Sequence, residues 1–176
     1  MRGVAARAIV LALVVSLAGC VSAQLTVISS FTSADGGFTI TVPGGAMAES
    51  TSAGSGPFAG ETVHAFVHDV PGGLRFAVLY ADAAPNYLAA MSLDAALDAA
   101  ELANIRATGG AQVDERHLTI AGLPVREQRI TGPAASYVFR TVFAGNRMYS
   151  ISVKGTDVQV READVIVYFD SFTITP

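Results

Sequence analysis

The stretch Pro124–Lys154, PVREQRITGPAASYVFRTVFAGNRMYSISVK, decides the fold of this chain. It contains three runs in which apolar and polar residues alternate, at 124–131, 137–144 and 147–154. Such alternation is typical of half-buried β-strands. The connections between the runs are only two to five residues long, too short for the crossover helix that joins parallel strands. We therefore expect an antiparallel meander, in which Gly145-Asn146 supplies the positive φ of a tight hairpin.

The residues before this meander contain further strand patterns. Phe38, Ile40 and Val42 alternate with threonines, and shorter patterns of the same kind occur at 63–67, 76–80 and 118–120. Segment 46–60 (AMAESTSAGSGPFAG) is instead rich in Gly, Ser and Ala, which predicts a loop with a mobile tip. The paired carboxylates Asp114-Glu115 are expected in a solvated turn.

Segment 92–108 (SLDAALDAAELANIRAT) interrupts the alternation and predicts a helix. Ser92 is a candidate N-cap, and Gly109-Gly110 follows the last turn. Five small or apolar residues form a stripe at helical spacing, which predicts close packing on a sheet: Leu93, Ala96, Leu97, Ala100 and Ala103. Leu102 and Ile105 fall outside the stripe, and we expect them to contact a loop.

The C-terminal stretch allows two interpretations. Val165, Phe169 and Phe172 recur at i, i+4 and i+7, which is typical of a helix over 161–170. The run 165–169 (VIVYF) is also typical of a buried strand. Periodicity leaves both interpretations open.

The first twenty residues, MRGVAARAIVLALVVSLAGC, have the three parts of a secretory signal. Arg2 and Arg7 precede an apolar run over 8–17, and small residues follow it. A transmembrane helix needs about 17 to 25 apolar residues, whereas the stretch 8–23 has 16 and includes Ser16, Gly19 and Ser22. These features predict a signal peptide over 1–19.

Leu17-Ala18-Gly19-Cys20 resembles the lipobox of bacterial lipoproteins. The resemblance implies a diacylglyceryl thioether on Cys20 and cleavage before it. Each buried methylene contributes about 0.8 kcal/mol, so two or three acyl chains make a stable membrane anchor. Two alternatives stay open: cleavage after Val21-Ser22-Ala23, which would release a soluble protein starting at Gln24, and an ordinary buried cysteine at position 20.

The composition is that of a globular chain, with 51% hydrophobic and 15% charged residues among 176. Without residues 1–19 it would hold nine basic and fifteen acidic residues, a net charge of −6. Such an acidic surface repels phosphate backbones and argues against nucleic acid as a partner. With Cys20 lipidated, no thiol remains for a disulfide.

Two arginines of the meander, Arg126 and Arg140, are candidates for a polar surface. Both alternate with apolar residues on adjoining predicted strands, so we expect them on one sheet face; cross-strand ion pairs are the simpler explanation for them. The aromatics Tyr137, Phe139 and Phe143 should share the opposite face, beneath the helix.

The sequence offers little for catalysis or metal binding. His64 and His68 would lie about 13 Å apart on a strand, too far to share one zinc ion. The chain has no G-x-S-x-G motif, and Ser55 lies in the predicted loop. His117 is expected to face solvent. We therefore expect no enzyme activity, no cofactor and no metal site.

The order of several short motifs resembles that of the PsbP/Mog1-like superfamily. They are a Phe-led strand ending at Pro43-Gly44, Tyr80-x-Asp82, the Ala/Leu helix with Gly109-Gly110, Gly122-x-Pro124-x-x-Glu127, Gly145-x-Arg147-x-Tyr149 and Phe169-Asp170-Ser171-Phe172. The resemblance implies an α+β fold, with a central antiparallel sheet of about six strands and flanking helices. One of those helices lies near the C-terminus, which favours helix over 161–170.

These observations predict a signal peptide at 1–19, a lipidated tether at 20–36 that includes one edge strand, and a PsbP/Mog1-like domain at 37–176. The namesakes of the superfamily are accessory or binding proteins, and many bacterial relatives are lipoproteins. We therefore expect a non-catalytic, lipid-anchored cell-envelope protein with an envelope protein as partner. The alternative is a carrier for a small apolar ligand such as a lipid. Val21 lacks the aspartate that retains lipoproteins at some inner membranes, so the periplasmic side of the outer membrane is the expected location in a Gram-negative cell.

Overall fold

The structure is a computed structural model that describes residues 28–84 and 86–175. Seven strands form one antiparallel sheet in the order β3-β4-β5-β9-β8-β7-β6, and three form a smaller sheet in the order β1-β2-β10. The strands are β1 (Ile28–Ser33), β2 (Phe38–Pro43), β3 (Ala48–Ala53), β4 (Thr62–Val70), β5 (Leu74–Asp82), β6 (Ala111–Ile120), β7 (Leu123–Thr131), β8 (Ser136–Ala144), β9 (Arg147–Gly155) and β10 (Thr173–Ile174). The α-helices are α1 (Tyr87–Ala90), α2 (Leu93–Thr108) and α3 (Ala163–Asp170), and short 3-10 turns occur at η1 (Gly56–Phe58) and η2 (Gln159–Arg161).

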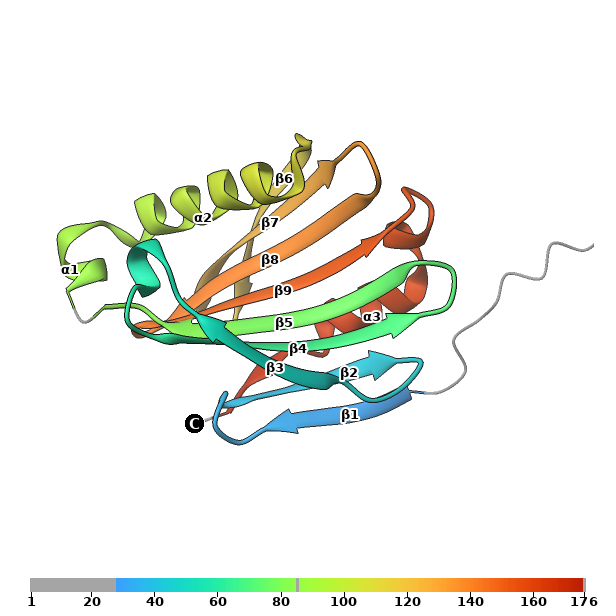
Figure 1. Cartoon of the computed structure of the whole chain (residues 1–176), viewed down its shortest axis with the longest axis horizontal. Helices are drawn as coiled ribbons and strands as arrows, with labels where there is room; N and C mark the ends of the chain where they lie inside the picture. The colour runs from blue at the N-terminus through green and yellow to red at the C-terminus, as the bar shows by residue number, and fades with distance from the viewer. Residues whose placement is uncertain (1–27, 85, 176) are drawn as a thin grey trace, which may run out of the picture.

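The elements form three layers. Helix α2 lies across β7 and β8 on one face of the large sheet, while the small sheet and α3 cover the opposite face (Figure 1). The molecule is therefore mostly β, with a seven-stranded main sheet and a second, three-stranded sheet. The sequence had predicted an α+β fold with one central sheet of about six strands. One reason for the difference is that β3 carries little hydrophobic patterning, so its sequence did not indicate a strand.

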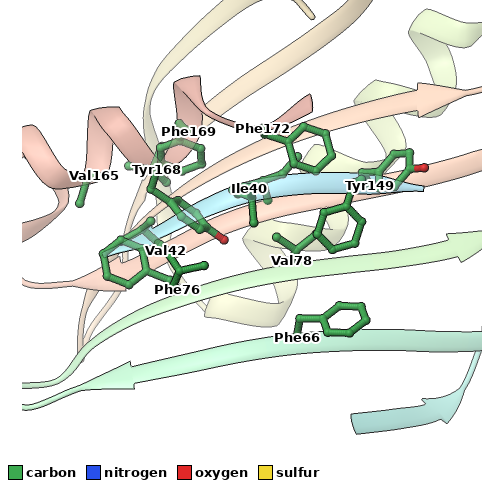
Figure 2. Close-up of a cluster of buried hydrophobic side chains, with 14 of the residues drawn as sticks. Ile40, Val42, Phe66, Phe76, Val78, Tyr149, Val165, Tyr168, Phe169 and Phe172 are labelled. Atoms are coloured by element: carbon green, nitrogen blue, oxygen red, sulfur yellow. The ribbon is translucent and has the colours of Figure 1, made fainter. Parts of the chain in front are cut away.

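The main core fills the space between the two sheets and α3. Alternate residues of β2, β5 and β9 point into it because successive side chains of a strand face opposite ways. Figure 2 shows how these side chains meet those of α3. The largest fully buried members are Phe38, Ile40, Phe76, Ile151 and Tyr168. The two sheets consequently share one hydrophobic core.

Both predicted helices are present. The Oγ of Ser92 accepts a hydrogen bond from the backbone N–H of Ala95 at 3.2 Å, and Gly109 ends α2 in the left-handed conformation with φ 60°. The ambiguous C-terminal stretch forms α3, so the helical interpretation is correct. Its side chains Val165, Tyr168 and Phe169 are buried against β2 and the large sheet.

The antiparallel meander β6-β7-β8-β9 is confirmed, including the tight turn at Gly145, whose φ is 59°. Three expectations were wrong. Segment 46–60 is not simply a loop, because residues 48–53 pair with β4 as an edge strand whose side chains are all exposed. Asp114-Glu115 lies within β6 beside a register shift, not in a turn. Leu102 is 53% exposed instead of packed on a loop.

Part of the segment assigned to a tether belongs to the folded domain. The expected edge strand is present as β1, which pairs with β2 along its whole length. The Phe31 ring lies 5.1 Å from that of Phe66 and 6.0 Å from that of Phe38. The folded part therefore extends back to at least Ile28, because these ring contacts and six backbone pairs hold β1 in place.

Candidate functional site

Helix α2 packs on an unusually polar region of the sheet. Arg126 of β7 is 9% exposed and points toward the helix, where its Nη2 donates to Asp94 at 3.3 Å and to Asp98 at 3.5 Å. Gln128, Thr141 and Ser150 on the same face are also buried. A buried arginine requires such partners, because an unpaired charge is costly to remove from water.

His117 of β6 joins this group at its outer margin. Arg126 Nη1 donates to His117 Nδ1 at 2.9 Å, so the other ring nitrogen carries the proton and donates to Glu115 Oε1 at 2.8 Å. The hydrogen bond from His117 holds the pKa of Glu115 below its ordinary value. The His117 side chain is 62% exposed, so this chain of hydrogen bonds lies open to solvent.

Deeper beneath the helix, Gln128 connects three polar groups. Its Nε2 donates to the Gln112 side chain at 2.6 Å and to the Glu101 backbone carbonyl at 3.3 Å, and its Oε1 accepts from Asn104 at 3.3 Å. The Glu101 residue is 8% exposed, and its Oε1 has no hydrogen-bond partner in the described part of the chain. Burial, together with the nearby Glu115 carboxylate, raises the pKa of Glu101.

A groove of about 500 Å³ lies between α2 and the sheet, next to this polar region. Phe143 and Met148 of β8 and β9 line it from the sheet side, and Ala96, Ala99 and Ala100 line it from the helix side. Phe58 and Tyr87 form part of its wall, with Tyr87 and Phe143 rings 6.4 Å apart. Alanines leave this space because they fill less of the helix–sheet gap than larger side chains would. The groove has the volume and the apolar lining of a small-ligand site.

The structure separates Arg126 from Arg140, contrary to the expectation that they share a face. Arg126 pairs with Thr141 across the ladder, whereas Arg140 pairs with Glu127 and faces α3. The Arg140 guanidinium donates to Glu127 at 2.7 Å and to Asp170 at 2.9 Å, and it lies 4.9 Å from the centre of the Phe169 ring. The two arginines therefore belong to two unconnected groups of ion pairs.

The register explains this error. Residues directly opposite one another on neighbouring strands point to the same face of the sheet. Arg126 lies opposite Thr141 and Arg140 lies opposite Glu127, so the two arginines point to opposite faces. A β7–β8 register shifted by one residue would place them on the same face. The sequence does not specify that register. For the same reason Tyr137, Phe139 and Phe143 share the face of Arg126, and of the three only Phe143 is buried beneath α2.

The histidines of β4 have separate partners. His64 Nδ1 lies 3.3 Å from Glu49 Oε1, and His68 Nδ1 lies 2.9 Å from the Ala46 carbonyl oxygen. In the described ranges, no group of three or more His, Cys, Asp or Glu side chains is placed to hold a metal ion. Cys20, the predicted lipid-attachment site, and the signal peptide at 1–19 lie outside the described residues. None of the described helices is long and apolar enough to cross a membrane.

Sequence reasoning missed the groove and the buried pair Glu101 and Gln128. The predicted alanine stripe was a partial signal, because small residues on a helix face allow either close packing or an empty space. Glu101 lies one turn after Leu97 on the buried side of α2, so its helical position could have identified it.

The fold is similar to that of known structures. The solution structure of cyanobacterial PsbP (CyanoP) from Synechocystis sp. PCC 6803 superimposes with a TM-score of 0.59, over 90% of this chain and 98% of that chain. The chain has a PsbP-like fold. The PsbP-like resemblance drawn from the sequence is thereby supported at the level of the fold. Sequence identity between the two is 9%, so the similarity concerns the fold alone. No family model and no curated protein matches the sequence.

Proposed function

We propose that this protein is a non-catalytic binding or assembly accessory, held at the cell envelope by acyl chains on Cys20. The anchor is supported by the Leu17-Ala18-Gly19-Cys20 motif behind its apolar segment. The observation that supports the binding role is the groove of about 500 Å³ between α2 and the strands β8 and β9. We infer that an envelope protein, and not a nucleic acid, is the partner, because the chain without residues 1–19 is acidic.

A non-catalytic role also agrees with how the histidines are used. His64 and His117 each contact a carboxylate, but Glu49 and Glu115 are 55% and 35% exposed. General bases work in sites from which water is largely excluded, and these two contacts lie at open positions.

The anchor is tested by Cys20→Ala. We expect the wild-type protein to stay with membranes after a carbonate wash, preferentially the outer membrane of a Gram-negative host, and the variant to become soluble. Intact-mass analysis of the wild type should show cleavage before Cys20 and added acyl chains. A wild-type protein that starts at Gln24 without a lipid adduct would refute the anchor and favour the soluble, exported form.

A second candidate function is that of a carrier for a small apolar ligand such as a lipid. The specific observation in its favour is the volume of the groove, because about 500 Å³ exceeds the roughly 300 Å³ at which small-molecule sites begin. Native mass spectrometry of protein purified from its host separates the two functions. A co-purifying lipid supports the carrier, whereas a clean protein mass supports the accessory.

A variant pair locates the ligand. Ala100→Trp would fill the groove from α2, whereas Ala107→Trp adds the same side chain at an exposed position of the same helix. For a carrier, we expect the lipid adduct to be lost only in Ala100→Trp. For an accessory, chemical crosslinking in intact envelopes should lose its partner band in Ala100→Trp and retain it in Ala107→Trp.

A further inference from the structure

A second pocket, about 270 Å³ in volume, lies at the edge of the space between the two sheets, on the side opposite α2. The turn between β1 and β2 meets the beginnings of β4 and β9 and the end of β5 there. The side chains that define its chemistry are Asp35, Glu61, His64, Tyr80, Asp82 and Arg147. None of these belongs to the groove beneath α2, so this pocket is a separate feature.

The turn that forms one wall is held in place by the large sheet. Arg147 Nη1 donates to the Asp35 backbone carbonyl at 2.7 Å, and the Tyr149 hydroxyl donates to the Gly36 carbonyl at 2.7 Å. A Cβ at Gly36 would lie 2.6 Å from Ser33 Oγ and 2.8 Å from the Phe38 ring, so only glycine allows this close approach. The wall is therefore fixed by the surrounding packing.

The pocket has an excess of negative charge. Arg147 Nε and Nη2 donate to the two oxygens of Asp82 at 2.7 and 2.8 Å, and this interaction lowers the pKa of Asp82. Among the described residues, no cationic side chain lies within ion-pair distance of the Asp35 or Glu61 carboxylate. Three carboxylates against one guanidinium leave a net charge of −2 when His64 is neutral. A ligand that complements this pocket must be cationic.

Tyr80 supplies a polar group from the buried side. The residue is 4% exposed, with its ring stacked on His64 at 4.6 Å between centroids and with the Arg147 guanidinium 4.9 Å from its centre. Its hydroxyl forms no hydrogen bond with another described residue, and the side chain lines the pocket. The oxygen is not sealed off from solvent, so it is free to accept an N–H from a ligand in the pocket.

We propose that this pocket binds a primary ammonium group, with the Asp35 and Glu61 carboxylates accepting its charge-assisted hydrogen bonds and the Tyr80 hydroxyl accepting a third. An ammonium carries three N–H donors on one compact charge, which matches the number and type of these acceptors. A divalent metal fits less well, because the described residues contain no cluster of three metal-ligating side chains. The ammonium belongs either to a free alkylamine or to a lysine side chain of a partner protein.

The experiment is a titration followed by protein NMR, at pH 7 and low ionic strength. The probes are 1,4-diaminobutane for a free amine and N-acetyl-lysine methylamide for a protein lysine, with succinate as a charge-reversed control. We expect saturable shifts at the pocket residues with at least one amine and none with succinate. Binding should weaken as salt is added, because both partners are charged. The tighter of the two amines identifies the source of the ammonium.

Three variants test the assignment of the acceptors. Asp35→Asn/Glu61→Gln should weaken amine binding about tenfold or more, and Tyr80→Phe should weaken it about fivefold. Asp157→Asn/Glu162→Gln makes the same change of charge beyond the opposite end of β9, and its affinity should stay within about twofold of wild type. Thermal unfolding of each variant shows that it is folded.

Two results would overturn the proposal. One is the absence of saturable shifts with both amines in the wild-type protein. The other is an equal loss of affinity in the pocket and control double variants, which would indicate attraction to the overall negative charge and not a site. Because the test uses the pocket between the sheets, its failure would leave the proposed role of the α2 groove untouched.

Discussion

At Glu101, helix α2 places a carboxyl group against the sheet where one of its oxygens lacks a hydrogen-bond partner among the described residues. The residue is 8% exposed, and Glu115 adds a second negative charge nearby. Both effects disfavour the ionised form and raise the pKa of Glu101. Ionisation of Glu101 therefore destabilises the folded protein relative to the unfolded chain, because the carboxylate is surrounded by water in the unfolded chain and buried in the folded protein.

Glu101→Gln should remove this penalty. At pH values below the ordinary pKa of glutamate the carboxyl is neutral in both states, so wild type and variant should differ little there. As the pH rises through and above that value, the wild type should lose stability relative to the variant. At pH 8 we expect the variant to be more stable by about 1–2 kcal/mol, the order of an unsatisfied buried group.

Urea unfolding of both proteins between pH 4 and pH 8 measures the difference. A difference that does not depend on pH would show that the carboxyl does not titrate in this range. Glu162→Gln is a suitable control, since this side chain is exposed and forms no capping hydrogen bond, and the substitution should change stability by less than about 0.5 kcal/mol.

Among the elements, α2 is held to the sheet by few apolar contacts. Its apolar cluster contains Ala96 and Leu97 from the helix and Phe143 from β8, with partly buried neighbours that include Tyr87 and Met148. The rest of the interface consists of hydrogen bonds and ion pairs around Arg126 and Gln128. Leu97 is fully buried, so it contributes much of the hydrophobic stabilisation of this helix.

Leu97→Ala should destabilise the protein by about 2–5 kcal/mol, because it removes buried methylenes and leaves a cavity. The matched substitution Leu102→Ala on the same helix should cost less than about 0.5 kcal/mol, because Leu102 is 53% exposed. Chemical denaturation measures both values. Similar losses in the two variants would contradict the observed orientation of α2.

For the whole molecule, the decisive feature is that one core joins both sheets. The Phe38 ring on β2 lies 5.6 Å from Phe66 of β4, 6.1 Å from Tyr149 of β9 and 5.6 Å from Phe172 after α3. If the two sheets separated, the core side chains of both sheets would become exposed to water. We therefore expect the two sheets to unfold together.

Phe38→Ala tests this coupling. The loss of a fully buried ring should cost about 3–5 kcal/mol and lower the midpoint of a single unfolding transition. Hydrogen exchange should increase in parallel in β2 and in the central strands β5 and β9. Faster exchange in β2 and β1 alone would show that the small sheet opens independently.

The sequence alone determined most of the elements. Alternation identified β2, β4, β5 and the meander, and the capping residues Ser92 and Gly109 marked the ends of α2, because these signals are local. The motif order also indicated the PsbP-like fold. The lipid-attachment motif at Cys20 is likewise a property of the sequence, and its consequence stays a prediction.

The tertiary structure alone decided which residues meet. The ladder register placed Arg126 and Arg140 on opposite faces, and only backbone pairing with β4 made a strand of the polar segment β3. The groove beneath α2 and the pocket at Tyr80 are likewise spaces between elements distant in sequence. Local patterns record which side of an element is buried, but register and packing depend on long-range contacts that no local window contains.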